Sequence, residues 1–306
     1  MTNYDKIVSR TGTGGELPQA LVDDVIGDVK TQSTIMALGH VITTNTADSR
    51  IPVLSQDVDA YWIAGDTGLK GTSAAQWTST SLYAEELAVV CPVPDNVVDD
   101  ASFPIWASLR PLIARAFARK LDAAALFGTN RPASWGPSML ETATAATAVI
   151  TKSTGTSADP AADMLKAAEL VSAQQLTPTA SAVRNGYQYA AGVTRTGAFN
   201  FSPVTERTPW PLSLAGLPIA TDPVYWEPTA AQVIVADWRQ CIVGVRKTLT
   251  FTMHKDGVIS DDTGKVITNL MTQDSTACRA VLRVGFLLKR PVIGTNTPTV
   301  PVAIVK

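Results

Sequence analysis

Few of the residues on which active sites and metal sites depend are present in this sequence. There are two histidines, His40 and His254, in unrelated segments, so a metal centre built on two or three histidines is not expected. The three cysteines, Cys91, Cys241 and Cys278, are odd in number, far apart and without a Cys-x-x-Cys pair. This pattern predicts neither a disulfide framework nor a zinc site, and it favours folding with reduced thiols.

Charged residues are also scarce, at 17% of the 306 residues against 45% hydrophobic. The formal net charge of −2 provides no basic field for gripping nucleic acid, so sequence-independent DNA binding is not expected to be the main task. A chain with so little charge exposes less charged surface than a free monomer would prefer. Obligate assembly would explain this composition.

Long apolar runs and catalytic motifs are missing as well. No stretch approaches the roughly 18 apolar residues of a membrane span, and the N-terminal residues lack the features of a signal peptide. No Gly-x-Ser-x-Gly elbow or catalytic cysteine signature is found. Paired carboxylates could bind calcium or act as acid and base, but isolated pairs are usually solvated charge. The pairs are Asp57 with Asp59, Glu85 with Glu86, and Asp99 with Asp100. We predict no enzyme activity, and no catalytic, cofactor-binding or metal-binding residues.

The most informative stretch that is present runs from Ser49 to Pro94. Two strand-like runs flank a glycine-containing tip, Ala64 to Thr72, and their apolar residues recur at mostly two-residue steps. These residues are Ile51, Val53, Val58, Tyr61, Trp62 and Ile63 on the outgoing arm, and Trp77, Tyr83, Leu87, Val89, Cys91 and Val93 on the return. A two-stranded ribbon is marginal in water, so we predict an arm that lies on a neighbouring subunit. The alternative is an ordinary hairpin folded back on its own domain.

The strongest helix signal follows, from near Ser102 to Phe127, with Gly128 as a C-cap. Pro111 should kink or restart this helix. We predict an apolar face and a polar face. The apolar face comprises Ile105, Leu109, Leu112, Ile113, Ala116 and Phe127, and the polar face Ser108, Arg115, Arg119 and Asp122.

The densest basic stretch lies on the same helix and consists of Arg110, Arg115, Arg119 and Lys120. We interpret it first as a solvated helix face with Asp122 as ion-pair partner. One alternative is that these residues form ion pairs between subunits, and another is that they make loose contact with DNA.

The rest of the chain gives shorter signals. Helices are expected at Pro18 to Thr31, from Asp159-Pro160 to Gln174, and at Ser181 to Ala191. Strands are expected at Ile35 to Ile42, around Thr147 to Thr151, at Leu214 to Thr221, at Val233 to Ala236, and repeatedly between Ile242 and Pro291. Residues 129–158 otherwise have the composition of loops.

Three sequence motifs together resemble those of a known protein family. The first motif ends the long helix and is Ala118-Arg119-Lys120-Leu121-Asp122-Ala123-Ala124-Ala125-Leu126-Phe127-Gly128. The second forms a strand and turn and is Leu214-Ala215-Gly216-Leu217-Pro218-Ile219. The third precedes Pro291 and is Arg279-Ala280-Val281-Leu282-Arg283-Val284-Gly285-Phe286. In their order and spacing they resemble the major capsid protein family of tailed bacteriophages, whose fold is shared with bacterial encapsulin nanocompartments.

The resemblance implies an α+β phage capsid fold in five parts. They are an N-terminal arm with a short helix (1–45), an extended β-hairpin loop (46–94), a peripheral domain with a spine helix and sheet (95–131 and 244–294), an axial domain (132–243) and a C-terminal tail (295–306). Trp62, Asp66, Lys70, Trp77, Tyr83, Arg115, Arg119 and Lys120 are the candidate inter-subunit contacts.

The resemblance also implies a function. Hexamers and pentamers would form an icosahedral shell around loosely contacted double-stranded DNA, assembled in a bacterial host's cytoplasm without membrane association. No large scaffolding domain precedes Pro18, which suggests a separate scaffolding protein or none. Scaffolding, decoration and portal proteins are the candidate partners. Some members crosslink a loop lysine to an asparagine, for which Lys70 with Asn269 or Asn296 are candidates, although no convincing catalytic glutamate is found. The alternatives are an encapsulin shell and a carboxylate-dependent hydrolase using Asp57, Asp59 or Glu85.

Overall fold

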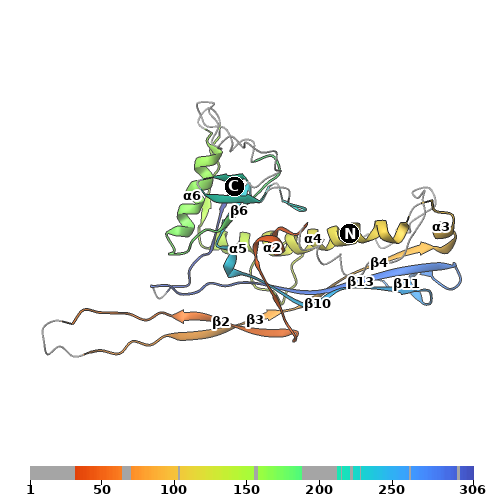
Figure 1. Ribbon diagram of the computed structural model, residues 1–306, viewed down its shortest axis with the longest axis horizontal. Coiled ribbons are helices and arrows are strands. Elements are labelled where there is room, and N and C mark those ends of the chain that lie inside the picture. Colours follow the sequence, from red (N-terminus) through yellow and green to blue (C-terminus); the bar gives the residue numbers. More distant parts are fainter. Residues whose placement is uncertain are drawn as a thin grey trace.

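A computed structural model of the chain describes residues 32–63, 70–102, 104–154, 158–187, 212–214, 216–220, 223–227, 229–261, 263–294 and 297–306. The molecule is elongated, with a horizontal body, an upper lobe and a long hairpin that projects from one end (Figure 1). The predicted helix from Pro18 to Thr31 lies outside the described residues. No helix in the described ranges is long and apolar enough to cross a membrane.

The body is a four-stranded sheet covered by the long helix α4. The strand order is β1, β10, β13, β4, in which β1 is parallel to β10 and the other neighbours are antiparallel. The bounds are β1 His40–Thr43, β10 Cys241–His254, β13 Ser275–Leu288, β4 Glu85–Pro94 and α4 Ile105–Phe127. Short elements complete its far end: α3 Asp95–Asp99, β11 Val258–Ser260 and β12 Val266–Asn269.

Helix α4 confirms the strongest sequence signal. It ends at Gly128, whose φ of 76° is left-handed and whose N–H bonds back to the last turn, as an αL cap requires. The helix continues through Pro111, so the expected restart there is not seen. The predicted apolar face was wrong at Leu112, which is 59% exposed, and at Ala116, which is also exposed.

A six-stranded sheet forms the upper lobe, in the order β5, β14, β9, β6, β8, β7. Helix α6 packs on one face of it, where Met164 and Val171 join an apolar cluster with β9 and β14. Helix α5 and the end of α4 cover the other face. The bounds are β5 Val149–Ile150, β6 Ala180–Val183, β7 Leu212–Leu214, β8 Leu217–Ala220, β9 Val233–Ala236, β14 Val302–Val305, α5 Met139–Ala145, α6 Pro160–Ser172 and the 3₁₀ turn η3 Trp238–Gln240.

Several local predictions for this lobe were wrong. The expected helix from Ser181 begins as the strand β6, because these residues pair with β9 and β8 and are buried on both sides. Helix α5 lies where only loops and a short strand were expected, and the strand β14 lies in the segment set apart as a tail. Both β9 and β14 are wholly buried, which is why they are continuous apolar runs.

The return arm of the hairpin is divided at Ala84. β2 (Asp48–Gln56) pairs with β3 (Gln76–Tyr83), but the next strand, β4, pairs with β13 in the body. The single return arm predicted to reach Val93 is therefore wrong, since Leu87 and Val89 pack on the central core instead.

Candidate functional site

A long two-stranded hairpin projects beyond the body of the molecule (Figure 1). Its strands β2 and β3 are antiparallel. Beyond these strands the Tyr61 hydroxyl donates to the carbonyl oxygen of Gly71 at 2.7 Å, and the backbone N–H of Asp59 donates to Ser73 Oγ at 2.8 Å. These bonds hold the two arms side by side toward the tip.

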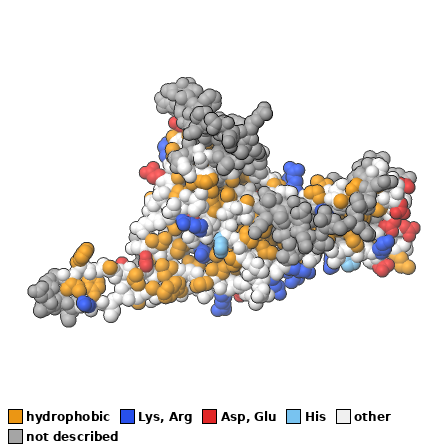
Figure 2. Space-filling model, in the orientation of Figure 1, with side chains coloured by type: hydrophobic (Ala, Val, Ile, Leu, Met, Phe, Trp, Pro, Cys, Tyr) orange, Lys and Arg blue, Asp and Glu red, His pale blue; other side chains and the backbone are white. Residues whose placement is uncertain are grey.

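The aromatic side chains of the hairpin face solvent in the single chain. Trp62 is 101% exposed and Trp77 is 66% exposed. Further exposed apolar side chains lie near the tip, namely Val58, Tyr61 and Ile63. Figure 2 shows hydrophobic side chains along this projection. The alternative of a hairpin folded back on its own domain does not describe this segment, and its apolar surface needs cover from elsewhere.

Two facing glycines let the root of the hairpin lie against the body. Gly244 of β10 and Gly285 of β13 are register partners. A Cβ atom on Gly285 would lie 2.5 Å from the carbonyl oxygen of Tyr83, and one on Gly244 would collide with the side chain of Leu82. Leu82 is 1% exposed and packs with residues of β10 and β13. The paired glycines form a notch in the sheet that seats β3.

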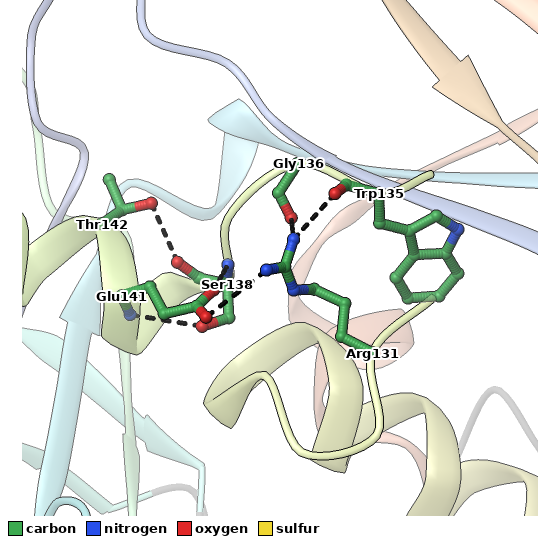
Figure 3. Close-up of polar contacts among 6 residues, drawn as sticks. All are labelled: Arg131, Trp135, Gly136, Ser138, Glu141 and Thr142. Carbon is green, nitrogen blue, oxygen red and sulfur yellow. Dashed lines mark hydrogen bonds and ion pairs between the residues drawn. The ribbon is translucent and has the colours of Figure 1, made fainter. Parts of the chain in front are cut away.

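The loop after α4 holds the hairpin root from another direction. The Nη1 of Arg131 donates to the carbonyl oxygens of Trp135 at 2.7 Å and Gly136 at 2.5 Å, and its Nη2 lies 3.4 Å from Glu141 Oε1 (Figure 3). The indole N–H of Trp135 then donates to the carbonyl oxygen of Tyr83 at 3.0 Å. Arg131 thus holds in place the loop whose Trp135 binds the root of the hairpin.

Glu141 links this loop to helix α5. The backbone N–H of Ser138 donates to Glu141 Oε2 at 2.7 Å, and the backbone N–H of Glu141 donates to Ser138 Oγ at 3.2 Å, which makes a capping box (Figure 3). The hydrogen bond from Ser138, with help from Arg131, lowers the pKa of Glu141. Its carboxylate therefore stays charged beside the guanidinium well below neutral pH.

The predicted basic face of α4 is exposed. Arg115, Arg119 and Lys120 all face solvent, and among the described residues none of them has an ion-pair partner. The interpretation that Asp122 pairs with them is wrong. Asp122 is fully buried near the end of α4, where the helix is covered on all sides.

Asp122 instead binds the start of helix α2 (Thr34–Leu38). Its Oδ1 accepts hydrogen bonds from Ser33 Oγ at 2.7 Å and from the N–H of Ile35 at 3.2 Å, and its Oδ2 accepts from the N–H of Thr34 at 2.9 Å. Ser33 also caps α2 by accepting from Met36. The predicted strand from Ile35 to Ile42 is wrong in its first half because these contacts start a helix there.

Burial and hydrogen bonding act on Asp122 in opposite directions. Burial is the larger effect and raises the pKa of Asp122 to about 6, although the hydrogen bonds from Ser33, Thr34 and Ile35 lower it. The carboxylate remains mainly ionised at neutral pH, where three donors converge on it.

The remaining candidates are widely separated. Lys70 is exposed beside the tip, and Tyr83, at the root, is 40% exposed. Asp66 and Asn296 lie outside the described residues. Asn269 ends β12 and pairs with Val258 of β11, which lies at the opposite end of the molecule from the hairpin (Figure 1). A Lys70–Asn269 crosslink would therefore have to join two subunits.

Two of the three acidic residues proposed for hydrolysis make structural contacts through their carboxylates. Asp57 Oδ2 accepts from the N–H of Gly294 at 3.2 Å, and Glu85 Oε1 accepts from Ser134 Oγ at 2.6 Å. The first contact ties the hairpin to the body, and the second joins the start of β4 to the loop after α4. Within the described part of the chain, no cluster of three or more His, Cys, Asp or Glu residues could hold a metal ion.

Sequence reasoning missed the residues that seat the hairpin. Gly244 and Gly285 lie inside strands, where glycine often marks a close backbone approach, so a local signal was present. Trp135 and Arg131 act through backbone carbonyls brought near by the fold, and no spacing in the sequence indicates that role.

Comparison with known proteins finds relatives of this chain in both sequence and structure. The major capsid protein of Staphylococcus phage 80alpha is 24% identical over 131 residues, which cover 42% of this chain and 40% of that protein. The chain thus matches about two fifths of that relative's length. A solved structure from Microbacterium phage Oxtober96 has a TM-score of 0.78 and 25% identity, covering 95% of this chain and 94% of its own. One from Mycobacterium phage Cain has a TM-score of 0.77 and 25% identity, covering 95% of both chains.

These structural neighbours confirm the expected α+β phage capsid fold. The model of the phage capsid family matches residues 14–292, which include the spine helix, the hairpin and both sheets up to β13. The chain belongs to the phage capsid family.

Proposed function

We propose that this chain is the major capsid protein of a tailed bacteriophage, with a structural role and no catalytic turnover. Copies would assemble as hexamers and pentamers into an icosahedral shell that encloses double-stranded DNA. The observation that carries the proposal is the projecting hairpin, on which Trp62 is 101% exposed.

The energetics of the hairpin favour self-association. Burying one large apolar side chain contributes about 1.5–3 kcal/mol, and Trp62 and Trp77 are both available in the single chain. Among the described residues no third strand pairs with β2 or β3, and a neighbouring subunit's surface can take that place. Each subunit would cover its neighbour's ribbon, and the contact would be repeated around a ring.

Charge on the body supports the same arrangement. The basic face at Arg115, Arg119 and Lys120 lies on α4, whereas Asp95 and Asp99 lie on α3. Acidic side chains are visible at the α3 end in Figure 2. Opposite charges at separate places on one chain favour ion pairs between different copies. The basic face could also make loose contact with packaged DNA.

We assign the parts of the chain by their expected roles. Residues 95–131 and 244–294 form the peripheral domain, and residues 132–243, with β14 added to their sheet, form the axial domain. Within residues 1–45, α2 and β1 belong to the body, so the N-terminal arm that the resemblance implies is shorter than this range. Assembly would occur in the cytoplasm of a bacterial host, with separate scaffolding, decoration and portal proteins as further partners.

Electron microscopy of the purified chain tests this function. The expected result is a hollow sedimenting particle with fivefold and sixfold capsomers. A chain that stays monomeric at high concentration would contradict the proposal. Particles that consistently contain a copurifying enzyme in place of DNA would favour the encapsulin alternative.

A further inference from the structure

The fold brings together two cysteines that are far apart in the sequence. Cys91 of β4 and Cys278 of β13 are direct register partners on neighbouring antiparallel strands. Directly opposite residues of an antiparallel pair point to the same face of the sheet, with Cα atoms about 4.5–5.5 Å apart. A disulfide needs Cα atoms about 4.4–6.8 Å apart, so the pairing has the required spacing.

Both thiols lie on the face of the sheet that α4 covers. Cys91 packs against the central core, whereas its neighbour Val90 is exposed on the other face. Cys278 is buried, and the adjacent Arg279 is exposed. Opposite register positions on a shared face place the two side chains next to each other.

One member of the pair is accessible. β4 is the outer strand of the four-stranded sheet, and Cys91 is half-buried there. The third cysteine, Cys241, is fully buried, with its thiol 3.9 Å from Met139 Sδ. A small reagent can therefore reach Cys91 first, and Cys241 provides an internal comparison.

We propose that Cys91 and Cys278 form a dithiol–disulfide site that closes a cross-strand bond between β4 and β13. The oxidant is a small disulfide such as oxidised glutathione. The Cys91 thiolate attacks one of its sulfur atoms and releases one glutathione thiolate. The Cys278 thiolate then attacks the Cys91 sulfur and releases the second. The two protein thiols are oxidised, the reagent is reduced to two thiols, and the two protons pass to the released thiolates.

The environment sets the rate of this exchange. Burial raises the pKa of the Cys91 thiol. The pKa of the Cys278 thiol is raised to about 11, mainly by burial and to a smaller extent by the neighbouring Cys91, although Arg110 lowers it. Few thiolates exist at neutral pH, so the exchange is slow there and accelerates as the pH rises.

The bond would fix the strand from which the hairpin emerges. β4 follows β3 directly in sequence and forms an edge of the sheet, where strands are most easily separated. Because Cys91 and Cys278 lie far apart in sequence, the bond closes a long loop and restricts the unfolded chain. Oxidation should therefore raise the unfolding temperature.

The test uses the full-length chain, both as unassembled subunits and as particles. The reduced protein is incubated with oxidised glutathione at mildly alkaline pH, quenched with N-ethylmaleimide, digested without reduction and analysed by mass spectrometry. We expect a linked peptide pair containing Cys91 and Cys278, with Cys241 labelled only after denaturation. Thermal unfolding should occur at a higher temperature in the oxidised than in the reduced protein.

Three variants sharpen the result. Cys91→Ser and Cys278→Ser should each lose the linked peptide and the redox-dependent shift, and Cys241→Ala should keep both. Three outcomes in the wild-type chain would each overturn the proposal, whatever the variants do. They are a lasting glutathione adduct on Cys91 without a linked peptide, a disulfide from Cys91 to another chain, and three thiols that remain fully labelled after oxidation.

Discussion

Asp122 places a carboxylate in the core beneath α2, where it accepts hydrogen bonds from Ser33, Thr34 and Ile35. Replacing it with alanine leaves three buried donors without an acceptor. We expect Asp122→Ala to lower the free energy of unfolding at neutral pH by about 2–3 kcal/mol. Urea denaturation of unassembled subunits would measure this. Asp122→Asn keeps one oxygen acceptor and should lose less, so equal stability of all three proteins would show that these bonds contribute nothing.

The same residue predicts a pH dependence. Burial raises the pKa of Asp122 from 3.8 to about 6, so the folded chain holds this proton more tightly than the unfolded chain. The part of the stability that is linked to this proton is therefore fully present below about pH 4 and is lost as the pH rises through about 6, whereas the hydrogen bonds to the carboxylate remain at neutral pH. Asp122→Asn cannot titrate. The unfolding free energy of the wild type should fall as the pH rises through this range. That of Asp122→Asn, measured over the same range, should not show this fall.

At the level of elements, the glycine notch decides how β3 crosses the sheet. An alanine at position 285 would push against the backbone carbonyl of Tyr83, which cannot move without displacing the hairpin root. We expect Gly285→Ala to destabilise the chain by about 1–3 kcal/mol, the usual cost of overpacking. Gly136→Ala is the matched control because no atom lies within 4 Å of its Cβ position. Denaturant unfolding should leave that control within about 0.5 kcal/mol of the wild type.

The loop after α4 gives a second test at this level. Arg131→Met removes the donors that hold two carbonyl groups, and we expect a loss of about 2 kcal/mol in unfolding free energy. Arg283→Met removes an exposed ion pair with Glu86 and should change it by less than about 1 kcal/mol. If denaturant unfolding shows that Arg283→Met is less stable than Arg131→Met, the proposed role of Arg131 in holding the hairpin root is wrong.

Elements that depend on local chemistry were predictable from the sequence. Gly128 ends α4 because left-handed backbone favours glycine, and Asp159 caps α6 in the expected way. Elements that depend on distant partners were not. The segment from Thr34 becomes helical through Asp122, and Ser181 lies in a strand because the sheet surrounds it. Helix α5 is different, since its capping box was visible in the sequence and was overlooked.

The hairpin shows the same division within the candidate site. Alternating apolar residues predicted a ribbon, and the exposure of Trp62 and Trp77 agrees with a ribbon that lacks cover. The end of the ribbon at Tyr83 depends on pairing between β4 and β13, which connects residues far apart in the chain. Residue spacing alone could not place that boundary, and the contact roles of the exposed residues stay predictions.

For the whole molecule, the central question is whether the exposed tryptophans serve folding or association. Trp62 contributes little to the stability of the single chain because it is 101% exposed. We expect Trp62→Ser to change the unfolding free energy of isolated subunits by less than about 0.5 kcal/mol. The same variant should raise the concentration needed for particle formation at least about tenfold, since roughly 1.4 kcal/mol lost per contact gives that factor.

The control for this prediction lies at the hairpin root. Leu82 is 1% exposed against the body, so Leu82→Ala should lower the unfolding free energy by about 2–5 kcal/mol before any effect on assembly is considered. Sedimentation of both variants over a range of concentrations separates the two roles. If Trp62→Ser forms particles at the wild-type concentration, the hairpin tip is not a subunit contact, and the apolar surface on the rest of the ribbon must be covered in another way.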